Sequence, residues 1–516
     1  MSDAIDQGIT VTEIQAMDEP VDVAAHTTAA FVGRALRGPL DTPVLVKSFA
    51  AFAHRFGGVW GRSSLGPAVK QFFEHGGTQV HVVRVANNAR GAMICLPAEH
   101  GVLVLTALEP GSTECIRAAV DYDGFDASDC EHFNLTVQRV APTTGLVADQ
   151  EIYRRVSCDP AADRYVADVL LASSLIRVSL PTPPGRPAPT GGTTPDVVAD
   201  YVGHAQRGSD GDELSDYDLI GSAERNTGLF ALEAVDQFDL LYLPPCGRRR
   251  DLGPAAILAA ELYCRKRGAM LILDPPAAWE TVDDAVHGVR DSGYSSANIM
   301  SYFPRMRVRN DQASAGRAVG GAIAGLLCKL DAARGPWEDL DQPGFGLNRA
   351  LRPALHVSAA EGAALVREGL NAIAGDDAGR ANVCGSVTLA RANQIDRKFE
   401  SLTVRRLCLQ ITNTIGRATR WAVFEEGGRR VAQRVRAQVH AYLASLADRG
   451  AFVDEHFDVQ CESGLHVDPL DPQRGVTILL SFQPAGGDYV WLTLHQTVQG
   501  CRVATTAFAP VTAECA

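Results

Sequence analysis

Residues 238–273 contain two short apolar runs joined by a segment of helical character. The runs at 238–243 (FDLLYL) and 270–273 (MLIL) are apolar at nearly every position, which is typical of strands buried on both faces. Between them, Pro254 stands where a helix begins and Gly268 where one ends. The order strand, helix, strand predicts a parallel β-α-β unit, so the sequence predicts a central α/β domain.

The bulk composition is that of a multidomain globular protein. The chain has 516 residues, 46% hydrophobic and 21% charged, and domains of ~100–200 residues predict about three packed units. A formal net charge of -13 disfavours nucleic acid and anionic membrane surfaces as partners. The N-terminus lacks a signal-peptide pattern and no run reaches the ~20 apolar residues of a membrane span, so we expect synthesis in the cytoplasm.

The first 85 residues read as a strand, a linker and a compact α/β unit. Residues 8–16 (GITVTEIQA) alternate as a strand does, and the acidic stretch 18–26 separates them from the α/β unit. Strands are then expected at 27–33, 43–48 and 79–85. Helices are expected from Ser48, an N-cap residue, to Gly57 and over residues 65–74.

The remaining chain alternates between β-rich and mixed stretches. Residues 91–180 contain short β runs, and 181–195 (PTPPGRPAPTGGTTP) are too rich in Pro and Gly for regular structure. Farther on, the patterns predict strands near 404–411, 476–482 and 489–496, a helix over 429–448 and an extended tail at 500–516. We therefore divide the chain into an arm with linker (1–26), an α/β domain (27–90), a β-rich domain (91–180), a linker (181–218), a central α/β domain (219–356), a last domain (357–499) and a C-terminal arm (500–516).

No motif for catalysis or for a metal site is specific. Asp274 and His287 could be partners in a hydrolytic triad, but no nucleophile phrase such as GxSxG accompanies them, and an Asp directly after a strand is commonly a turn residue. The acidic run 209–218 lacks the spacing of a calcium loop, GFGLNR at 344–349 lacks a preceding strand, and His75 and His81 lack a third ligand. The twelve cysteines contain no CxxC pair. We expect neither a cofactor nor a metal.

Four phrases, in order over most of the chain, resemble the contractile phage tail sheath family, which also provides the sheaths of tailocins and contractile injection systems. They are TAAFVGRALRGPLDTPVLVKSFAAFAHRFGG with LGPAVKQFFEHGGTQVHVVRV, then GSDGDELSDYDLIG with TGLFALEAVDQFDLLYLPP, then NIMSYFPRMRV, and finally VRRLCLQITNTIGRATRWAVFEEG. Two phrases depart from the family pattern. They are EEGG at 425–428 and PAGGDYV at 484–490.

The resemblance implies a fold and a set of partners. The fold is mixed α/β and α+β, with an inner α+β domain built from N- and C-terminal segments, a central subtilisin-like parallel α/β domain, an inserted β-rich outer domain and extended terminal arms. The implied role is that of a non-enzymatic structural subunit of a virion tail or an injection particle. Its partners would be copies of itself in stacked hexameric rings, an inner tail tube, and baseplate and tail terminator proteins.

The resemblance also implies that the terminal arms add strands to the sheets of neighbouring subunits. Strand addition supplies main-chain hydrogen bonds of about 0.5–1.5 kcal/mol each. The residues expected to make these contacts lie on the two arms, namely Ile9, Val11, Ile14, Val503, Thr505 and Phe508.

The helix predicted at 429–448 has an apolar stripe and a basic face. Val431, Val435, Val439, Tyr442 and Leu446 recur at helical spacing. Cations near a helix N-terminus are disfavoured by the helix dipole, so they favour an acidic partner, which the resemblance suggests is the tube. A solvated face balanced by Glu425 and Glu426 explains the pattern equally well. The cations concerned are Arg429, Arg430, Arg434 and Arg436.

The cysteines allow one covalent hypothesis. Cys501 and Cys515 lie on the expected C-terminal arm, and Cys461 lies in the domain that would receive such an arm. Oxidation after release from the cell could then join neighbouring subunits.

Three classes of protein remain open: a sheath subunit, a hydrolase on a subtilisin-like α/β scaffold, and a secreted adhesin or other assembly protein. Within the first class the sequence does not choose between a phage tail, a tailocin and a cellular injection system. A two-protein type VI sheath fits less well, because this one chain carries both arms and all the domains.

Overall fold

The computed structural model describes residues 27–191, 200–247, 250–308, 316–375, 381–390, 399–425, 428–463, 475–497 and 500–505. The chain divides into two compact units, one of residues 27–333 with 338–402, the other of residues 334–337 with the part from Thr403 on. The chain is thus a mixed α/β multidomain protein with several sheets. None of the helices in the described ranges combines the length and apolar character needed to cross a bilayer.

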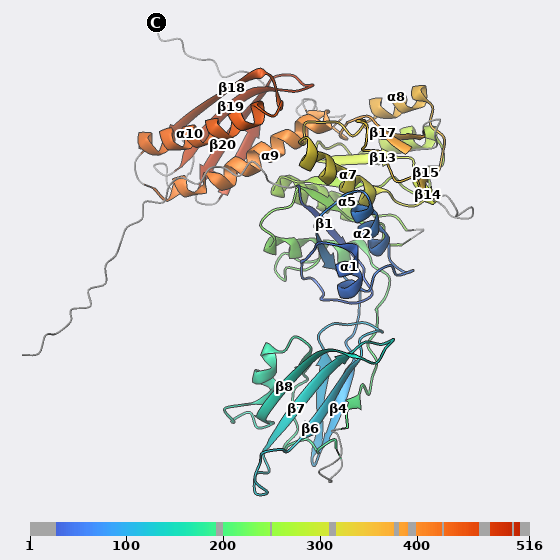
Figure 1. Cartoon of the computed structure of the whole chain (residues 1–516), viewed down its shortest axis with the longest axis vertical. Helices are drawn as coiled ribbons and strands as arrows, with labels where there is room; N and C mark the ends of the chain where they lie inside the picture. The colour runs from blue at the N-terminus through green and yellow to red at the C-terminus, as the bar shows by residue number, and fades with distance from the viewer. Residues whose placement is uncertain are drawn as a thin grey trace, which may run out of the picture. The chain divides into compact units, whose positions relative to one another are not determined.

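The first unit is built on an eight-stranded sheet (Figure 1). Neighbouring strands run parallel except at the two edges, where β2 and β17 are antiparallel to their partners. In spatial order the strands are β17 (Ala381–Cys384), β16 (Asn371–Gly375), β13 (Ile299–Phe303), β12 (Met270–Leu273), β11 (Leu240–Tyr242), β1 (Ala29–Gly33), β3 (Val80–Arg84) and β2 (Val44–Val46).

Helices cover both faces of this sheet. On one face Ala30 and Val32 belong to a core cluster with residues of four α-helices. On the other face Phe31 packs edge-on against Phe72 and Tyr242, and two helices pack against each other. The helices on the first face are α4 (Asp216–Ile220), α5 (Pro254–Arg267), α6 (Val282–Ser292) and α8 (Ala359–Arg367). Those on the second are α2 (Leu65–Glu74) and α7 (Gly320–Ala333), and α1 (Phe49–Phe56) contacts α2.

The helix boundaries predicted from capping residues are confirmed. The side chain of Ser48 accepts a hydrogen bond from the amide of Ala51, and Gly57 ends α1 in a left-handed conformation with φ of 88°. The helix α5 begins at Pro254 and ends before Gly268, with φ of 66°. Local sequence signals therefore fix these two helices.

Strands from the two predicted domains 27–90 and 219–356 belong to the same sheet. Strand β1 pairs with β3 on one side and with β11 on the other, so that Ala29 lies beside both Val80 and Leu240. The strand order reverses at this point, because the chain builds outward to β3 and β2 and later returns to add β11. Periodicity identifies strands but not distant partners, so the sequence does not reveal this pairing.

The β-rich region is inserted between β3 and β11. It forms two sheets around an apolar cluster that includes Leu103, Phe133 and Ile176. Its elements are β4 (Met93–Ala98), β5 (Gly101–Ala107), β6 (Ile116–Asp121), β7 (His132–Val140), β8 (Val147–Ser157), α3 (Val166–Val169), β9 (Ile176–Val178) and β10 (Val202–Gly203). A separate two-stranded sheet of β14 (Met306–Val308) and β15 (Leu351–Pro353) completes the first unit.

The second unit contains two helices and a four-stranded antiparallel sheet, seen together in Figure 1. Its elements are α9 (Leu402–Ala418), the short 3-10 helix η4 (Arg420–Val423), α10 (Gly428–Ala447), β18 (Phe452–Ser463), β19 (Val476–Pro484), β20 (Val490–Thr497) and β21 (Gly500–Thr505). The predicted strands near 476–482 and 489–496 are confirmed, whereas the prediction of strands near 404–411 is wrong, because these residues lie within α9.

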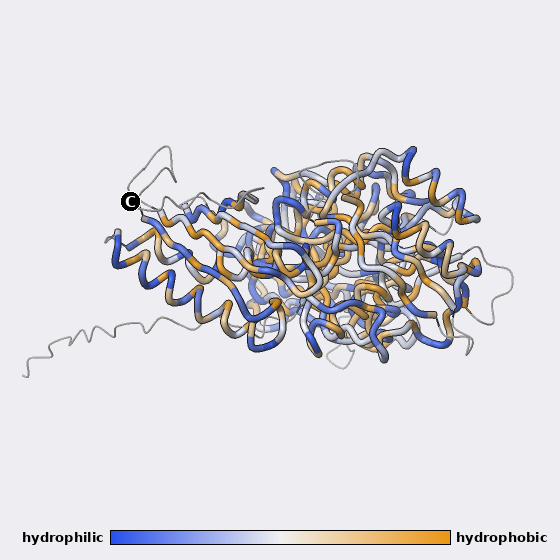
Figure 2. Tube along the Cα trace, turned by 90° about the horizontal axis from the view of Figure 1, so that it is seen from above, coloured by the Kyte–Doolittle hydropathy of each residue, from blue (hydrophilic) through white to orange (hydrophobic). Residues whose placement is uncertain are grey.

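The spacing of the apolar residues explains why 404–411 form part of a helix and not a strand. Val404, Leu407, Ile411 and Ile415 are all buried and recur at three or four residues, the period of a helix face. The predicted stripe on α10 is confirmed, since Val431, Val435, Val439, Tyr442 and Leu446 are buried. Figure 2 shows hydrophilic and hydrophobic residues alternating along the helices of this unit.

Candidate functional site

The carboxyl end of the parallel sheet is where α/β proteins commonly bind ligands, next to the point where strand order reverses. Here this position lies between β1 and β11. Arg34, directly after β1, donates to the carbonyl oxygens of Asp210 at 2.8 Å and Gly211 at 2.9 Å, and its guanidinium lies 5.0 Å from the Trp60 ring centre. The chain's own segments thus occupy this end of β1.

A second buried network lies at the ends of β11 and β12. Tyr242 donates to Asp274 Oδ2 at 2.5 Å, and Asp274 Oδ1 accepts from the amides of Val319 at 2.9 Å and Gly320 at 3.0 Å, where α7 begins. Burial raises the pKa of the Asp274 carboxyl and, well above its usual value, the pKa of the Tyr242 hydroxyl. The carboxylate serves to hold α7 against the sheet.

Asp274 and His287, the two residues considered for a hydrolytic triad, have different hydrogen-bond partners. Both oxygens of Asp274 accept hydrogen bonds from Tyr242 and the start of α7. His287 is an exposed residue of α6, and its Nδ1 lies 2.8 Å from the carbonyl oxygen of Asp283. Neither arrangement resembles the base and orienting pair of a triad.

The acidic run 209–218 stabilises turns and helix starts. Asp210 accepts from the amide and hydroxyl of Ser112 at 2.7 and 2.8 Å. Asp216 accepts from Gly253 and Ala256 at the start of α5, and Asp218 forms a capping box with Ser215. Within the described ranges no group of three His, Cys, Asp or Glu side chains could hold a metal ion.

The four arginines predicted on α10 differ in their surroundings. Arg434 pairs with Glu425 and lies over the Trp421 ring at 4.3 Å, and Arg436 donates to the Val459 carbonyl oxygen at 3.0 Å. Arg429 and Arg430 are exposed at the start of the helix. The solvated-face interpretation therefore explains Arg434, while Arg429 and Arg430 stay candidates for a partner contact.

Sequence reasoning missed three neighbours of this basic face. Arg417 lies in the last turn of α9, Arg420 begins η4 and Phe424 follows it, and all three side chains are exposed. These three residues lie close to Arg429 and Arg430 along the chain, and we call the five together the arginine patch. None of their guanidinium groups makes an ion pair with a described residue. The signal was present in the sequence, but the strand prediction for 404–411 hid the helix that carries Arg417.

The predicted arm contacts are only partly within the described residues. Val503 and Thr505 lie in β21, which pairs antiparallel with β20 of the same chain, Val503 beside Leu494 and Thr505 beside Leu492. Ile9, Val11, Ile14, Phe508 and Cys515 lie outside the described residues. The contact with a neighbouring subunit stays a prediction.

Cys461 and Cys501 lie on different strands of the same sheet, with β19 and β20 between them. Burial raises the pKa of Cys461 to about 12 and that of Cys501 to about 11. The Cβ and Sγ of Cys501 lie close to Gly416 of α9. Both thiols are half-buried. Because two strands separate them, a disulfide between them within one chain would require β21 to leave this position.

We expect Cys461 and Cys501 to react slowly with iodoacetamide at pH 8. A thiol of pKa near 11 is ~0.1% thiolate at that pH, whereas an ordinary thiol of pKa ~8.5 is roughly one quarter thiolate, so the rates should differ by about 100-fold or more. Because the pKa values are raised, reactivity should increase as pH rises toward 11. Exposed Cys130 is the internal control in a mass-spectrometric time course. Labelling of Cys461 or Cys501 as fast as Cys130 would contradict the expectation.

Comparison with known proteins was informative only at the level of structure. No model of a protein family matches the sequence, and no curated protein matches it significantly. Sheath tail proteins from Listeria innocua and Desulfitobacterium hafniense are similar in structure, with TM-scores of 0.59 and 0.55 and 14% identity each. The alignments cover 91% and 95% of this chain and 94% and 99% of those chains.

A third similar structure is the sheath complex of an extracellular contractile injection system, PVC, in its contracted state. It has a TM-score of 0.54 and 14% identity, with 94% of this chain and 95% of that chain covered. The likeness extends over nearly the whole length of each chain, with the inserted β-rich region included. The chain therefore has the fold of the sheath proteins of contractile tails and injection systems.

Proposed function

We propose that this protein is the structural subunit of a contractile sheath, which polymerises helically around an inner tube and contracts to drive that tube through a target cell envelope. The observation that carries the proposal is the likeness to sheath proteins over more than nine tenths of both chains. A local domain shared by chance would not extend through every unit. The proposal places the protein in a virion tail or an injection particle, with tube, baseplate and terminator proteins as partners.

Within this proposal the parts of the chain have separate roles. The eight-stranded sheet belongs to the central, subtilisin-like domain, and the inserted β-rich region from β4 to β10 forms the outer domain. The unit that begins at Thr403 faces the tube, a narrower range than the predicted 357–499, because β16 and β17 belong to the eight-stranded sheet of the other unit. Contraction needs no nucleotide at the subunit, because a lattice assembled in a metastable state can relax to a better-packed one.

Strand β21 supports the arm hypothesis through its geometry. It pairs with β20 along Gly500–Thr505 at the edge of the sheet, the position that an arm from a neighbouring copy would occupy. An element that is paired within one chain can be exchanged between identical chains at little cost, since the same contacts form in both states. We propose this exchange for the C-terminal arm and strand addition by residues 8–16 for the N-terminal arm.

Electron microscopy of the purified full-length protein tests the proposal. We expect long hollow cylinders of uniform diameter, alone or around co-expressed tube protein. Deleting residues 1–16 should leave a folded monomer and abolish the cylinders, as judged by circular dichroism and microscopy. A full-length protein that stays monomeric with and without tube protein would exclude the sheath function, whereas full-length cylinders from the deleted chain would exclude only the N-terminal arm.

The arginine patch is the surface that we propose for the tube. Reversing the charge of Arg429 and Arg430 together should reduce co-sedimentation with tube protein by about tenfold or more, because each substitution replaces attraction by like-charge repulsion against an acidic partner. The double reversal of exposed Arg225 and Arg349 changes net charge equally and should leave co-sedimentation unchanged. Equal binding by both double variants would exclude this contact.

A further inference from the structure

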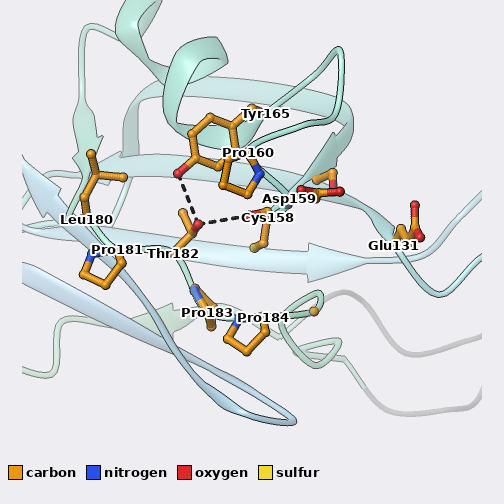
Figure 3. Close-up of a pocket in the computed structure, with 12 residues that line it drawn as sticks. Glu131, Cys158, Asp159, Pro160, Tyr165, Leu180, Pro181, Thr182, Pro183 and Pro184 are labelled. Carbon is orange, nitrogen blue, oxygen red and sulfur yellow. Dashed lines mark hydrogen bonds between the residues drawn. The ribbon is translucent and has the colours of Figure 1, made fainter.

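The inserted β-rich region contains a pocket of about 740 Å³ (Figure 3). Two segments form most of its wall, residues 157–160 at the end of β8 and residues 180–185 shortly after β9, and Glu131 lies at one side. Pockets of ~300–1,000 Å³ are the size that holds small organic ligands. The size alone makes this pocket a candidate binding site, and the chemistry of its lining residues indicates which class of ligand it could bind.

The two segments are fixed to each other by hydroxyl groups. Thr182 Oγ1 donates to the carbonyl oxygen of Cys158 at 2.9 Å, and it lies 3.1 Å from the hydroxyl of Tyr165. Because the Thr182 proton is used on Cys158, Tyr165 is the donor in the second bond. Figure 3 shows this chain of bonds within the wall. The pocket is therefore formed in advance, and both hydroxyl protons are committed to the wall.

The lining offers many acceptors and few donors. Its backbone includes Pro160, Pro181, Pro183 and Pro184, which have no N–H group. The charged side chains in the lining are two carboxylates, Glu131 and Asp159, and the lining contains no Lys, Arg or His. One oxygen of Asp159 accepts from the amide of Ala161 at 2.9 Å, which leaves its second oxygen for a ligand. A ligand that fits must bring donors and positive charge.

The apolar and acidic groups lie at different ends of the pocket. In Figure 3 Leu180 and Pro181 are on one side and Glu131 is on the other, with Asp159 toward Glu131. Leu180 lines the pocket and is 68% exposed, so its side chain is accessible to a ligand. An apolar end opposite an acidic end matches a ligand with an aliphatic body and a cationic end. A neutral sugar fits less well, because its hydroxyl groups also need donors from the protein.

We propose that this pocket binds an aliphatic ammonium ion, with the alkyl chain against Leu180 and the prolines and the ammonium group beside Asp159 and Glu131. The inference rests on the pocket itself and does not depend on the sheath function. Both carboxylates are exposed, so their attraction is screened by salt and the binding is weakened at high ionic strength.

Saturation-transfer NMR on the full-length protein, with n-hexylammonium as the probe at pH 7 and low salt, tests the proposal. We expect n-hexylammonium to bind about tenfold more tightly than 1-hexanol, and the double variant Glu131→Gln with Asp159→Asn to lose this preference. Asn keeps an oxygen for the Ala161 amide, so the loop should keep its fold. The matched control, exposed Glu99→Gln with Asp126→Asn, removes the same charge elsewhere and should bind as the unaltered protein does.

The apolar end is tested by chain length. The unaltered protein should bind n-hexylammonium about tenfold or more tightly than n-propylammonium, and Leu180→Ala should reduce that ratio several-fold. Equal binding of 1-hexanol and n-hexylammonium, or unchanged binding by the Glu131 and Asp159 double variant, would overturn the proposal. Binding of methyl glucoside that the double variant does not weaken would overturn it as well, in favour of a saccharide.

Discussion

Replacing Arg84 by methionine is expected to lower the free energy of unfolding of the first unit by about 3–5 kcal/mol. Arg84 ends β3 and is 1% exposed. It donates to the carbonyl oxygens of Ala35 at 3.1 Å, Gly38 at 2.5 Å and Pro110 at 2.7 Å. Methionine fills a similar volume but leaves these buried acceptors without donors, which is the costly part of the change.

The contacts of Arg84 also connect two parts of the unit. Ala35 and Gly38 belong to the loop after β1, while Pro110 belongs to the inserted region. Burial lowers the pKa of Arg84 to about 10, with Glu109 and Asp210 opposing the shift, so the side chain stays charged at neutral pH. The cation is therefore stabilised by carbonyl dipoles and more distant carboxylates, and removing it should loosen the attachment of the insertion to the sheet.

Urea denaturation followed by tryptophan fluorescence, together with limited proteolysis, measures both effects. Arg84→Lys keeps the charge, but an ammonium group cannot donate to all of these carbonyl groups as the planar guanidinium does. Its urea midpoint should therefore lie between those of the unaltered protein and Arg84→Met. Arg225→Met, at an exposed position, is the control for loss of one positive charge. A urea midpoint for Arg84→Met equal to that of Arg225→Met would show that the network contributes nothing.

The elements with strong local signals could be predicted from the sequence. Helix α5 begins and ends at the predicted residues because Pro254 and the left-handed Gly268 mark both ends. The stretch 404–411 misled, since Val404, Leu407 and Ile411 combine strand-forming residue types with helical spacing. The spacing of the apolar residues predicts this element better than their strand propensity does. Burial selects one face of an element, whereas tertiary packing easily overrides propensity.

The long-range arrangement could not be predicted in the same way. Nothing near Ala29 indicates that its partners are Val80 and Leu240. The pocket was missed for the same reason. The Pro-rich run from 181 on was interpreted as a linker or surface loop, and its role as a donor-poor wall depends on contact with Cys158 and Tyr165. Arg429 and Arg430 are exposed, and their contact with a tube stays a prediction.

Replacing Gly321 by alanine is expected to destabilise the first unit by about 2 kcal/mol, and replacing it by valine by about 3 kcal/mol or more. Helices α2 and α7 cross closely here, since a Cβ at Gly321 would lie 2.3 Å from the carbonyl oxygen of Ala68 and 2.8 Å from its Cα. One turn later a Cβ at Gly325 would lie 2.3 Å from the carbonyl oxygen of Phe72. The obstacle is backbone, so no change of rotamer relieves it and the helices must separate.

The direction of this effect distinguishes packing from helix propensity. Alanine is better than glycine within a helix by about 1 kcal/mol, so substitution at a roomy site should stabilise. Gly362 of α8 offers that matched control, because a Cβ there would meet Ala372 Cβ at 3.6 Å and Val357 Cγ1 at 3.9 Å, which are ordinary contacts. We therefore expect the urea midpoint to fall for Gly321→Ala and to stay or rise for Gly362→Ala. A shift of the same sign in both variants would mean that the close crossing of α2 and α7 does not limit the stability of this unit.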